Sequence, residues 1–349
     1  MWLLDNTIYC HPNEDYKTVA AIYFSTNFTL AGESKWSFHG NRLSVLGLGT
    51  GGAYIALVKA SVEVTASTLV VSNNVMAATS NCSSGLVCIL SFDRVVSLLR
   101  STGLFTNNQM HAVTLTDASL AFVIEFDEII MRFSTWSMTM NVMTASSKGS
   151  GSETFVFHFY SAVSITSSST WNIVSNNMSS ACQGGTGSNA HGLVFKSTLS
   201  LINSQWQFCF NSTVASAASS ATVMLFHSVA SLTTGSTWVI RALSMKTTSA
   251  TLGVFIFFII TYGTLVVDGT SKAVLMQCDA TGTPPNIALV SGDLQVATSG
   301  HLGMISNRWY GTLTYTYNVQ IVPKFTSITR LTWPDSWGPH ANDRTQHLR

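Results

Sequence analysis

Apolar and polar residues alternate along most of this chain in short pieces of four to six residues. In residues 192–211 (GLVFKSTLSLINSQWQFCFN), apolar side chains recur at every second position, and short polar turns interrupt them. This period of two is typical of β-strands that bury one face. Looser Ser- and Gly-rich stretches, such as residues 179–190 (SSACQGGTGSNA), separate the pieces. The pattern predicts a unit of three short strands and one variable loop.

The unit repeats about every 34 residues. The segments STWSMTMNVM (134–143), STWNIVSNNM (169–178), SQWQFCFNST (204–213) and STWVIRALSM (236–245) share one frame, and earlier copies begin at residues 34, 67 and 101. Successive anchor positions of this frame are 32 to 35 residues apart, at Trp36, Leu69, Gly103, Trp136, Trp171, Trp206 and Trp238. A fixed period of this length indicates a repeat architecture.

Two further columns keep the same frame. Five residues after the anchors stand Asn41, Asn74, Asn108, Asn141, Asn176 and Asn211, with Leu243 in the next copy. Before the anchors stand Phe24, Val58, Phe92, Phe126, Phe159, Phe195, Phe226 and Phe257. Strands stacked about 4.8 Å apart bring equivalent residues of successive repeats into contact, which favours uniform columns and asparagine ladders.

These columns predict an all-β fold, a right-handed parallel β-helix of the pectin-lyase type with about 34 residues per coil. The Trp and Phe columns would fill the interior, and the Asn column would lie at an inward turn. β-Propeller blades are the main rival, but they are about 40 to 45 residues long and need four strands. Helical repeats do not fit a chain dominated by Ser, Thr, Val and Gly.

The repeat also predicts the domain boundaries. We expect a lead-in over residues 1–20, solenoid repeats over 21–300, terminal strands over 301–330 and an irregular tail over 331–349. The longest apolar run, residues 252–267, is shorter than the roughly 20 residues of a spanning helix and rich in β-branched and aromatic residues. We interpret it as a buried strand. The first residues lack the long apolar core of a signal peptide.

Composition narrows the possible functions. Charged residues make up 9% of the chain and the net charge is +1, so clustered basic residues for a nucleic-acid partner are not expected. The six cysteines form no CxxC pair and no metal-ligand spacing with histidine. We therefore expect no metal and no cofactor.

Candidate catalytic chemistry is confined to one acidic row. Asp93 and Asp127 both follow the Phe column, and Glu125 is close by in sequence. These acids could bind a cation or act on a sugar, as carboxylate pairs do in glycosidases. The alternative is a solvated row in which Lys59 neutralises Asp93, with Tyr160, Lys196 and His227 further along the same line. The HExxH and GxSxG motifs are absent from the sequence, and we predict a protein that is not an enzyme.

Four N-x-S/T sequons are candidate glycosylation sites, at Asn27, Asn81, Asn177 and Asn211. Asn81 falls in a predicted loop and is the best acceptor. Asn211 belongs to the inward Asn column and Asn177 is beside it, so the repeat would bury both.

The segments STWNIVSNNM and STWSMTMNVM, within Ser/Thr-rich repeats over residues 20 to 290, resemble the dispersed gene family surface proteins of trypanosomes. This resemblance implies a very long, largely β-helical, glycosylated and membrane-associated protein that contacts host components. The chain departs from such proteins in its shortness and in its charged tail.

By this resemblance we expect a non-enzymatic cell-surface or adhesion-type solenoid, a fragment of a larger membrane-associated glycoprotein. Its partner would be a host or extracellular protein or glycan. The partner would bind a face formed by the predicted loops 77–86, 144–153, 179–191 and 213–221. Membrane association would come from other parts of the parent protein. A carbohydrate-active β-helix that binds or cleaves polysaccharide is the alternative, and a fragment without its own function is a third possibility.

Overall fold

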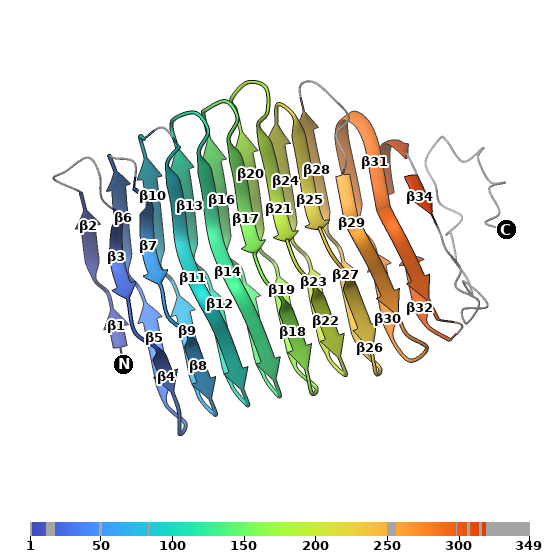
Figure 1. The fold of residues 1–349 in the computed structure, drawn as a ribbon, viewed down its shortest axis with the longest axis horizontal. Helices are drawn as coiled ribbons and strands as arrows, with labels where there is room; N and C mark the ends of the chain where they lie inside the picture. Colours follow the sequence, from blue (N-terminus) through green and yellow to red (C-terminus); the bar gives the residue numbers. More distant parts are fainter. Residues whose placement is uncertain are drawn as a thin grey trace.

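The chain forms an elongated stack of β-strand coils in the computed structural model, with successive coils side by side along the long axis (Figure 1). The structure describes residues 2–11, 18–48, 51–82, 84–249, 256–297, 299–305, 308–313 and 316–318. These ranges contain 34 β-strands and no helix. The described part of the chain therefore contains no helix that could span a membrane.

Four stacks of strands run along the solenoid, and each full coil contributes one segment to every stack. The first stack is a separate sheet of ten strands: β1 (Trp2–Leu4), β5 (Lys35–His39), β9 (Thr68–Ser72), β12 (Thr102–Thr106), β15 (Thr135–Thr139), β19 (Thr170–Val174), β23 (Gln205–Cys209), β27 (Thr237–Arg241), β30 (Lys272–Met276) and β32 (His301–Ile305). The second stack follows it in each coil and contains β2 (Thr7–Cys10), β6 (Arg42–Gly47), β10 (Val75–Ser80), β13 (Gln109–Thr114), β16 (Val142–Ser147), β20 (Asn177–Cys182), β24 (Ser212–Ala217), β28 (Ser244–Ser249), the start of β31 (Asp279–Val296) and β33 (Arg308–Leu313).

The other two stacks run one after the other, and in some coils a single long strand serves both. The third stack contains β3 (Val19–Phe24), β7 (Ala53–Val58), β17 (Glu153–Phe159), β21 (Asn189–Phe195), β25 (Ser220–Phe226) and the first parts of β11 (Leu86–Leu99), β14 (Leu120–Arg132) and β29 (Ile256–Val267). The fourth contains the second parts of β11, β14 and β29, together with β4 (Phe28–Leu30), β8 (Val62–Thr65), β18 (Val163–Thr166), β22 (Leu199–Ile202) and β26 (Ala230–Thr233). β31 continues into both, and β34 (Thr316–Asn318) pairs with it.

The pairing confirms the predicted parallel β-solenoid and its register. Trp136 lies opposite Trp171, Trp171 opposite Trp206 and Trp206 opposite Trp238, all in parallel ladders. The Phe column pairs in the same way from Phe92 to Phe226. A propeller is excluded, because the strands of one blade are antiparallel neighbours, whereas these strands pair with their counterparts in the next coil.

The prediction of three strands and one loop per coil is wrong, because a fourth strand occupies the first part of the predicted loop. In the coil of residues 153–188, β20 begins at Asn177, directly after the Asn column. Its inward residues are Met178, Ser180 and Cys182, all buried. Because Ser180 and Cys182 are small or polar, the alternation of hydrophobic and polar residues does not reveal this strand.

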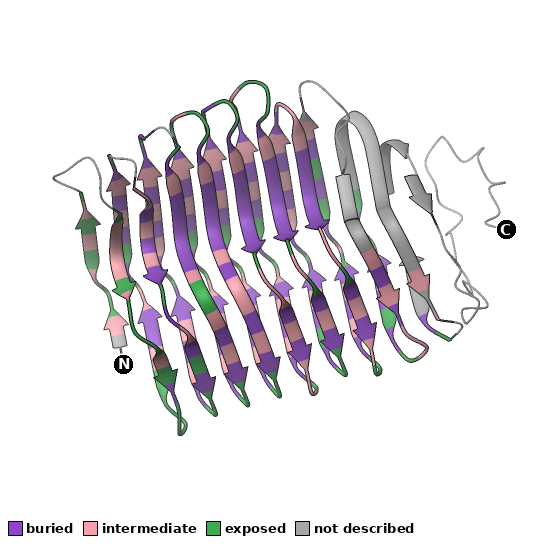
Figure 2. Ribbon diagram, in the orientation of Figure 1, coloured by how far each residue is buried: buried purple, intermediate pink, exposed green. Residues whose placement is uncertain are grey.

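Stacked aromatic rings fill the interior, as predicted. The ring centroids of Trp171 and Trp206 are 5.3 Å apart, those of Trp206 and Trp238 are 4.8 Å apart, and those of Phe159 and Phe195 are 4.5 Å apart. The Phe rings meet the Trp rings edge-on, a favoured arrangement of aromatic quadrupoles. Figure 2 shows the buried positions repeating from coil to coil.

The Asn column forms the predicted ladder of hydrogen bonds. In each step the side-chain Nδ2 of one asparagine donates to Oδ1 of the next over 2.9 to 3.1 Å, and the backbone N–H of the first donates to the same oxygen. Asn6, which the repeat frame did not include, adds a first rung by donating to Asn41. The described ladder ends at Asn211, since Leu243 offers no side-chain acceptor.

A serine ladder, not predicted, runs along the corner where the strands of the first stack begin, whereas the Asn ladder lies where they end. The backbone N–H of Ser67 donates to Ser101 Oγ, Ser101 N–H to Ser134 Oγ and Ser134 N–H to Ser169 Oγ, over 3.1 to 3.2 Å. Residues with positive φ, such as Arg100 (51°) and Phe133 (52°), precede these serines, and Met140 (56°) precedes the Asn column in the same way. Each corner thus combines a left-handed residue with a polar residue that satisfies the turning backbone.

The remaining sequence expectations fall partly outside the described residues. The apolar run of residues 252–267 contains β29, which is a strand as predicted, but the Phe257 side chain is not among those described. Residues 301–330 contribute β32, β33 and β34, and the tail of residues 331–349 lies outside the described ranges. All six cysteines are free thiols.

Candidate functional site

In β17, β21 and β25, six consecutive residues of the third stack are buried, so both faces of these strands are covered. In β17, Val156, Phe157 and Phe159 pack into the main core, whereas Phe155 belongs to a separate cluster with Cys88, Phe122, Val194 and Leu225. Two consecutive core residues, Val156 and Phe157, therefore break the alternation of the strand. The separate cluster lies on the outer side of this wall.

A row of exposed or half-buried polar residues runs beside this outer cluster, directly after the Phe column. We call it the outer row: Lys59, Asp93, Asp127, Tyr160, Lys196 and His227. Its members occupy equivalent positions in successive coils, as the backbone bonds from Tyr160 N to Phe126 O (2.8 Å), Lys196 N to Phe159 O (2.8 Å) and His227 N to Phe195 O (2.9 Å) show. Coils are about 4.8 Å apart, so the row spans roughly 24 Å.

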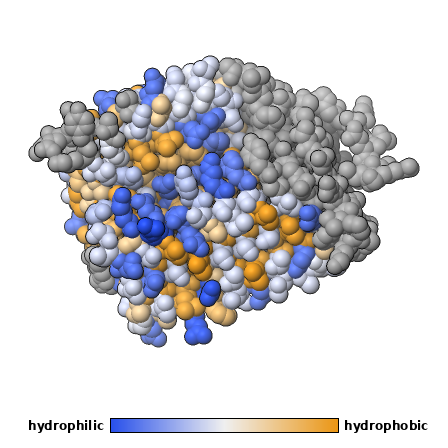
Figure 3. All heavy atoms as spheres, viewed as in Figure 1, coloured by the Kyte–Doolittle hydropathy of each residue, from blue (hydrophilic) through white to orange (hydrophobic). Residues whose placement is uncertain are grey.

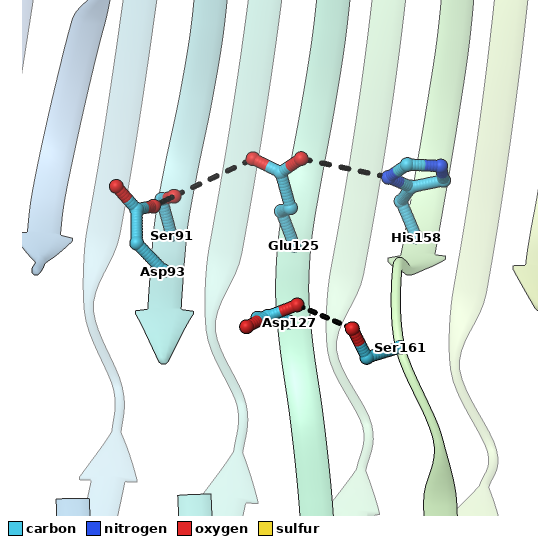
Figure 4. A network of polar contacts seen from close by, with 6 residues as sticks. All are labelled: Ser91, Asp93, Glu125, Asp127, His158 and Ser161. Atoms are coloured by element: carbon cyan, nitrogen blue, oxygen red, sulfur yellow. Dashed lines mark hydrogen bonds and ion pairs between the residues drawn. The ribbon is translucent and has the colours of Figure 1, made fainter. Parts of the chain in front are cut away.

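The two predicted acids, Asp93 and Asp127, lie in this row and form hydrogen bonds with different partners (Figure 4). Asp93 accepts a hydrogen bond of 2.7 Å from Ser91 Oγ, and Lys59 Nζ is 3.9 Å from its other oxygen. Asp127 accepts a bond of 2.6 Å from Ser161 Oγ. The Lys59–Asp93 pair is exposed, so it contributes little stability. Among the described residues no group of three His, Cys, Asp or Glu side chains is arranged to hold a metal ion.

Glu125 and His158 form a contact that the sequence did not suggest. His158 Nδ1 lies 3.5 Å from Glu125 Oε1, and the two side chains are 3% and 18% exposed. The His158 ring packs against Phe122 and Phe155, with centroids 5.1 and 4.8 Å away, and the Tyr160 ring meets its edge. One column, two residues before the outer row, contains Ser91, Glu125 and His158. Extending the repeat alignment to this column would have predicted their proximity.

Two further titratable side chains of the same wall, Cys88 and His191, are buried. Burial raises the pKa of the Cys88 thiol well above its usual value, so this cysteine is not a reactive thiolate. His191 is buried, stacks on Phe155 with centroids 5.0 Å apart, and its Nδ1 lies 2.5 Å from Thr222 Oγ1. Burial lowers the pKa of His191 to about 3. This histidine is neutral in the folded protein at ordinary pH.

His191 makes stability depend on pH. Its pKa is 6.5 in the unfolded chain and about 3 in the folded protein, so below pH 6.5 the unfolded state binds a proton that the folded state rejects. The stability present above pH 6.5 is therefore lost progressively as the pH falls toward 3. We expect His191→Phe to flatten the decline of the urea midpoint between about pH 6.5 and pH 4. Thr222→Val, which leaves the ring buried, should keep the wild-type slope; equal slopes in wild type and His191→Phe would contradict the assignment.

The sequons divide into three exposed sites and one buried site. Asn27, Asn81 and Asn177 are exposed, so the expected burial of Asn177 is wrong: the residue opens β20 with its side chain outward. Asn27 Oδ1 accepts a bond of 3.2 Å from Ser61 N. Asn211 is 2% exposed and its Nδ2 donates to Ile173 O over 2.8 Å. The folded coil therefore withholds Asn211 from a glycosyltransferase.

The predicted loops begin inside strands, but the true loops do lie along one edge of the solenoid. They join the second stack to the third at residues 81–85, 148–152, 183–188 and 218–219, along the upper edge in Figure 1. The face of the solenoid seen in Figure 3 carries hydrophilic and hydrophobic side chains in small interspersed patches. Both the loop edge and the outer row are thus available as long surfaces.

Comparison with protein-family models, with curated proteins and with solved structures finds no match to this chain.

Proposed function

We propose that this chain is a non-enzymatic binding scaffold of the cell-surface or adhesion type, part of a longer membrane-associated glycoprotein. Its partner would be an extracellular protein or glycan that lies along the outer row. Solenoids commonly bind through such extended surfaces, because each coil contributes one contact.

One observation carries this proposal: the outer row changes its chemistry every coil or two, whereas the interior columns keep one residue type over several coils, as from Trp136 to Trp238. Packing favours Trp against Trp and Asn against Asn in the interior, whereas the equivalent outward positions carry Lys59, Asp93, Tyr160 and Lys196. After Lys59 the row offers two carboxylates, then Tyr160, which is 61% exposed, and then the amine of Lys196 and the imidazole of His227. Such a sequence of different groups suits the recognition of one extended ligand.

The hydrogen bonds to Asp93 and Asp127 favour a binding role for these acids over a catalytic role. Asp93 and Asp127 each accept a hydrogen bond from a serine of their own wall, and neither is buried. A carboxylate that a neighbouring hydroxyl group holds in place is oriented to accept a further hydrogen bond or an ion pair from a bound partner.

The exposed sequons give the first test. Protein from the cells that produce it naturally would be treated with an N-glycosidase in heavy-oxygen water, and intact cells would be labelled with a membrane-impermeant reagent. We expect a mobility shift, surface labelling, and isotope-marked deamidation at one or more of Asn27, Asn81 and Asn177. Asn211 is the internal control and should remain unmarked. No shift together with no labelling would contradict a surface role.

A carbohydrate-active protein is the second candidate, because carboxylates, an exposed tyrosine ring and basic groups lie together in the outer row. Asp93→Asn combined with Asp127→Asn separates this candidate from the first in an assay of polysaccharide cleavage. Cleavage by the wild type that the double variant loses would establish an enzyme and overturn the proposed scaffold.

A further inference from the structure

The core of the solenoid contains a cavity at its N-terminal end. It has a volume of about 50 Å³ and only apolar side chains line it, among them Phe24, Phe28, Trp36, Val58 and Leu69. A water molecule needs at least roughly 10 to 15 Å³ and several polar partners. The cavity is large enough for several water-sized groups but offers them no hydrogen bond, so it favours apolar atoms.

The second coil creates this cavity because its side chains are too small for their columns. The Phe column reads Phe24, Val58 and Phe92 in three successive coils, and the Trp column reads Trp36, Leu69 and Gly103. Both columns therefore lose their aromatic ring in the coil of residues 53–80. From Trp136 to Trp238, by contrast, the Trp column is continuous.

Aromatic layers close the space on two sides. In the first coil, Phe28 packs against Phe24 and Trp36, with centroids 5.6 and 5.8 Å away. On the other side, Phe92 stacks on Phe126 and Phe105 stacks on Trp136, at 5.0 and 5.5 Å. The two layers are two coils apart, about 10 Å, so the aliphatic second coil leaves a slot between them.

The rings of the first coil cover the slot less completely than the rings of later coils cover theirs. Phe24, Phe28 and Trp36 are only half-buried, in contrast to the fully buried rings from Trp136 onward. Small shifts of the first coil would admit a ligand without disturbing the continuous columns.

We propose that this cavity is a binding site for a small hydrocarbon group, either a free apolar molecule or the end of an aliphatic chain. Apolar cavities in proteins stay dry and bind uncharged apolar ligands such as xenon. The site is separate from the outer row and does not depend on the proposed scaffold function.

Xenon is the probe that tests the site, through its ¹²⁹Xe chemical shift as the protein concentration is raised. Val58→Phe fills the slot by continuing the Phe column between Phe24 and Phe92, and Val58→Ala enlarges it. We expect a saturable xenon shift in the wild type and in Val58→Ala, and a shift at least about fivefold smaller in Val58→Phe. No saturable shift in the wild type, or an equal shift in Val58→Phe, would overturn the proposal.

Hexanoate distinguishes the two sources of hydrocarbon. A concentration-dependent rise of the melting temperature in the wild type but not in Val58→Phe would identify the end of an aliphatic chain as a ligand. Xenon binding without any effect of hexanoate would identify a closed site for free apolar molecules. If Val58→Phe fails to fold, the comparison of wild type with Val58→Ala decides: a wild type that binds no xenon rejects the site.

Discussion

Replacing Asn176 by alanine is expected to lower the free energy of unfolding by about 3 to 6 kcal/mol. Asn176 Oδ1 accepts from both the backbone N–H and the Nδ2 of Asn141, and its own Nδ2 donates to Met138 O. All these groups are buried, so the substitution leaves two donors and a carbonyl without these partners. Each such group costs about 1 to 3 kcal/mol. Urea unfolding followed by tryptophan fluorescence would measure the loss.

Asn177→Ala is the matched control for this substitution. Asn177 is the next residue, has the same side chain and is exposed, so its replacement should change stability by no more than about 0.5 kcal/mol. If the two variants unfold at the same urea concentration, the ladder contributes no net stability. An altered slope of the transition would instead mean that the coils no longer unfold together.

Trp206→Ala is expected to cost about 3 to 5 kcal/mol, because it removes a fully buried ring from the middle of the aromatic column. The Trp206 ring stacks on both Trp171 and Trp238. Its loss opens a cavity between two rings that the parallel backbone holds in place, so the neighbours cannot collapse into the space. Thermal and urea unfolding would both report the change.

Trp206→Phe separates ring packing from polar contacts. Trp206 Nε1 is buried and has no hydrogen-bond partner among the described residues, so losing the indole N–H removes no bond. Phenylalanine keeps a stacked ring, and we expect it to cost less than half as much as alanine. Equal costs for the two variants would mean that an interaction of Nε1, not the stacking, stabilises this site.

The repeat frame predicted the features of this fold that depend on large or uniform side chains. The spacing of Trp136, Trp171 and Trp206 is enough to place them in one column, because parallel stacking brings equivalent residues together. The Asn ladder followed from the same reasoning, and its donors and acceptors are those expected of an inward amide.

The features that the frame missed depend on small or mixed side chains. The strand β20 buries Ser180 and Cys182, which a hydrophobic pattern does not mark as inward. Glu125 and His158 meet on the outer side of the wall, and their burial results from the rings of neighbouring coils, not from their own hydropathy. The cavity could be suspected from Val58 and Leu69, which are exceptions in two aromatic columns, but its volume depends on how far the neighbouring rings fill the space.

The asparagine ladder also gives the solenoid a net dipole along its long axis. Each side-chain carbonyl accepts from the preceding coil and each Nδ2 donates to the following one, so the amide dipoles add from Asn6 to Asn211. As in an α-helix, aligned dipoles leave partial charges at the two ends, and mutual polarisation strengthens every bond in the chain of amides. The Asn6 end of the ladder carries the negative pole and the Asn211 end the positive pole.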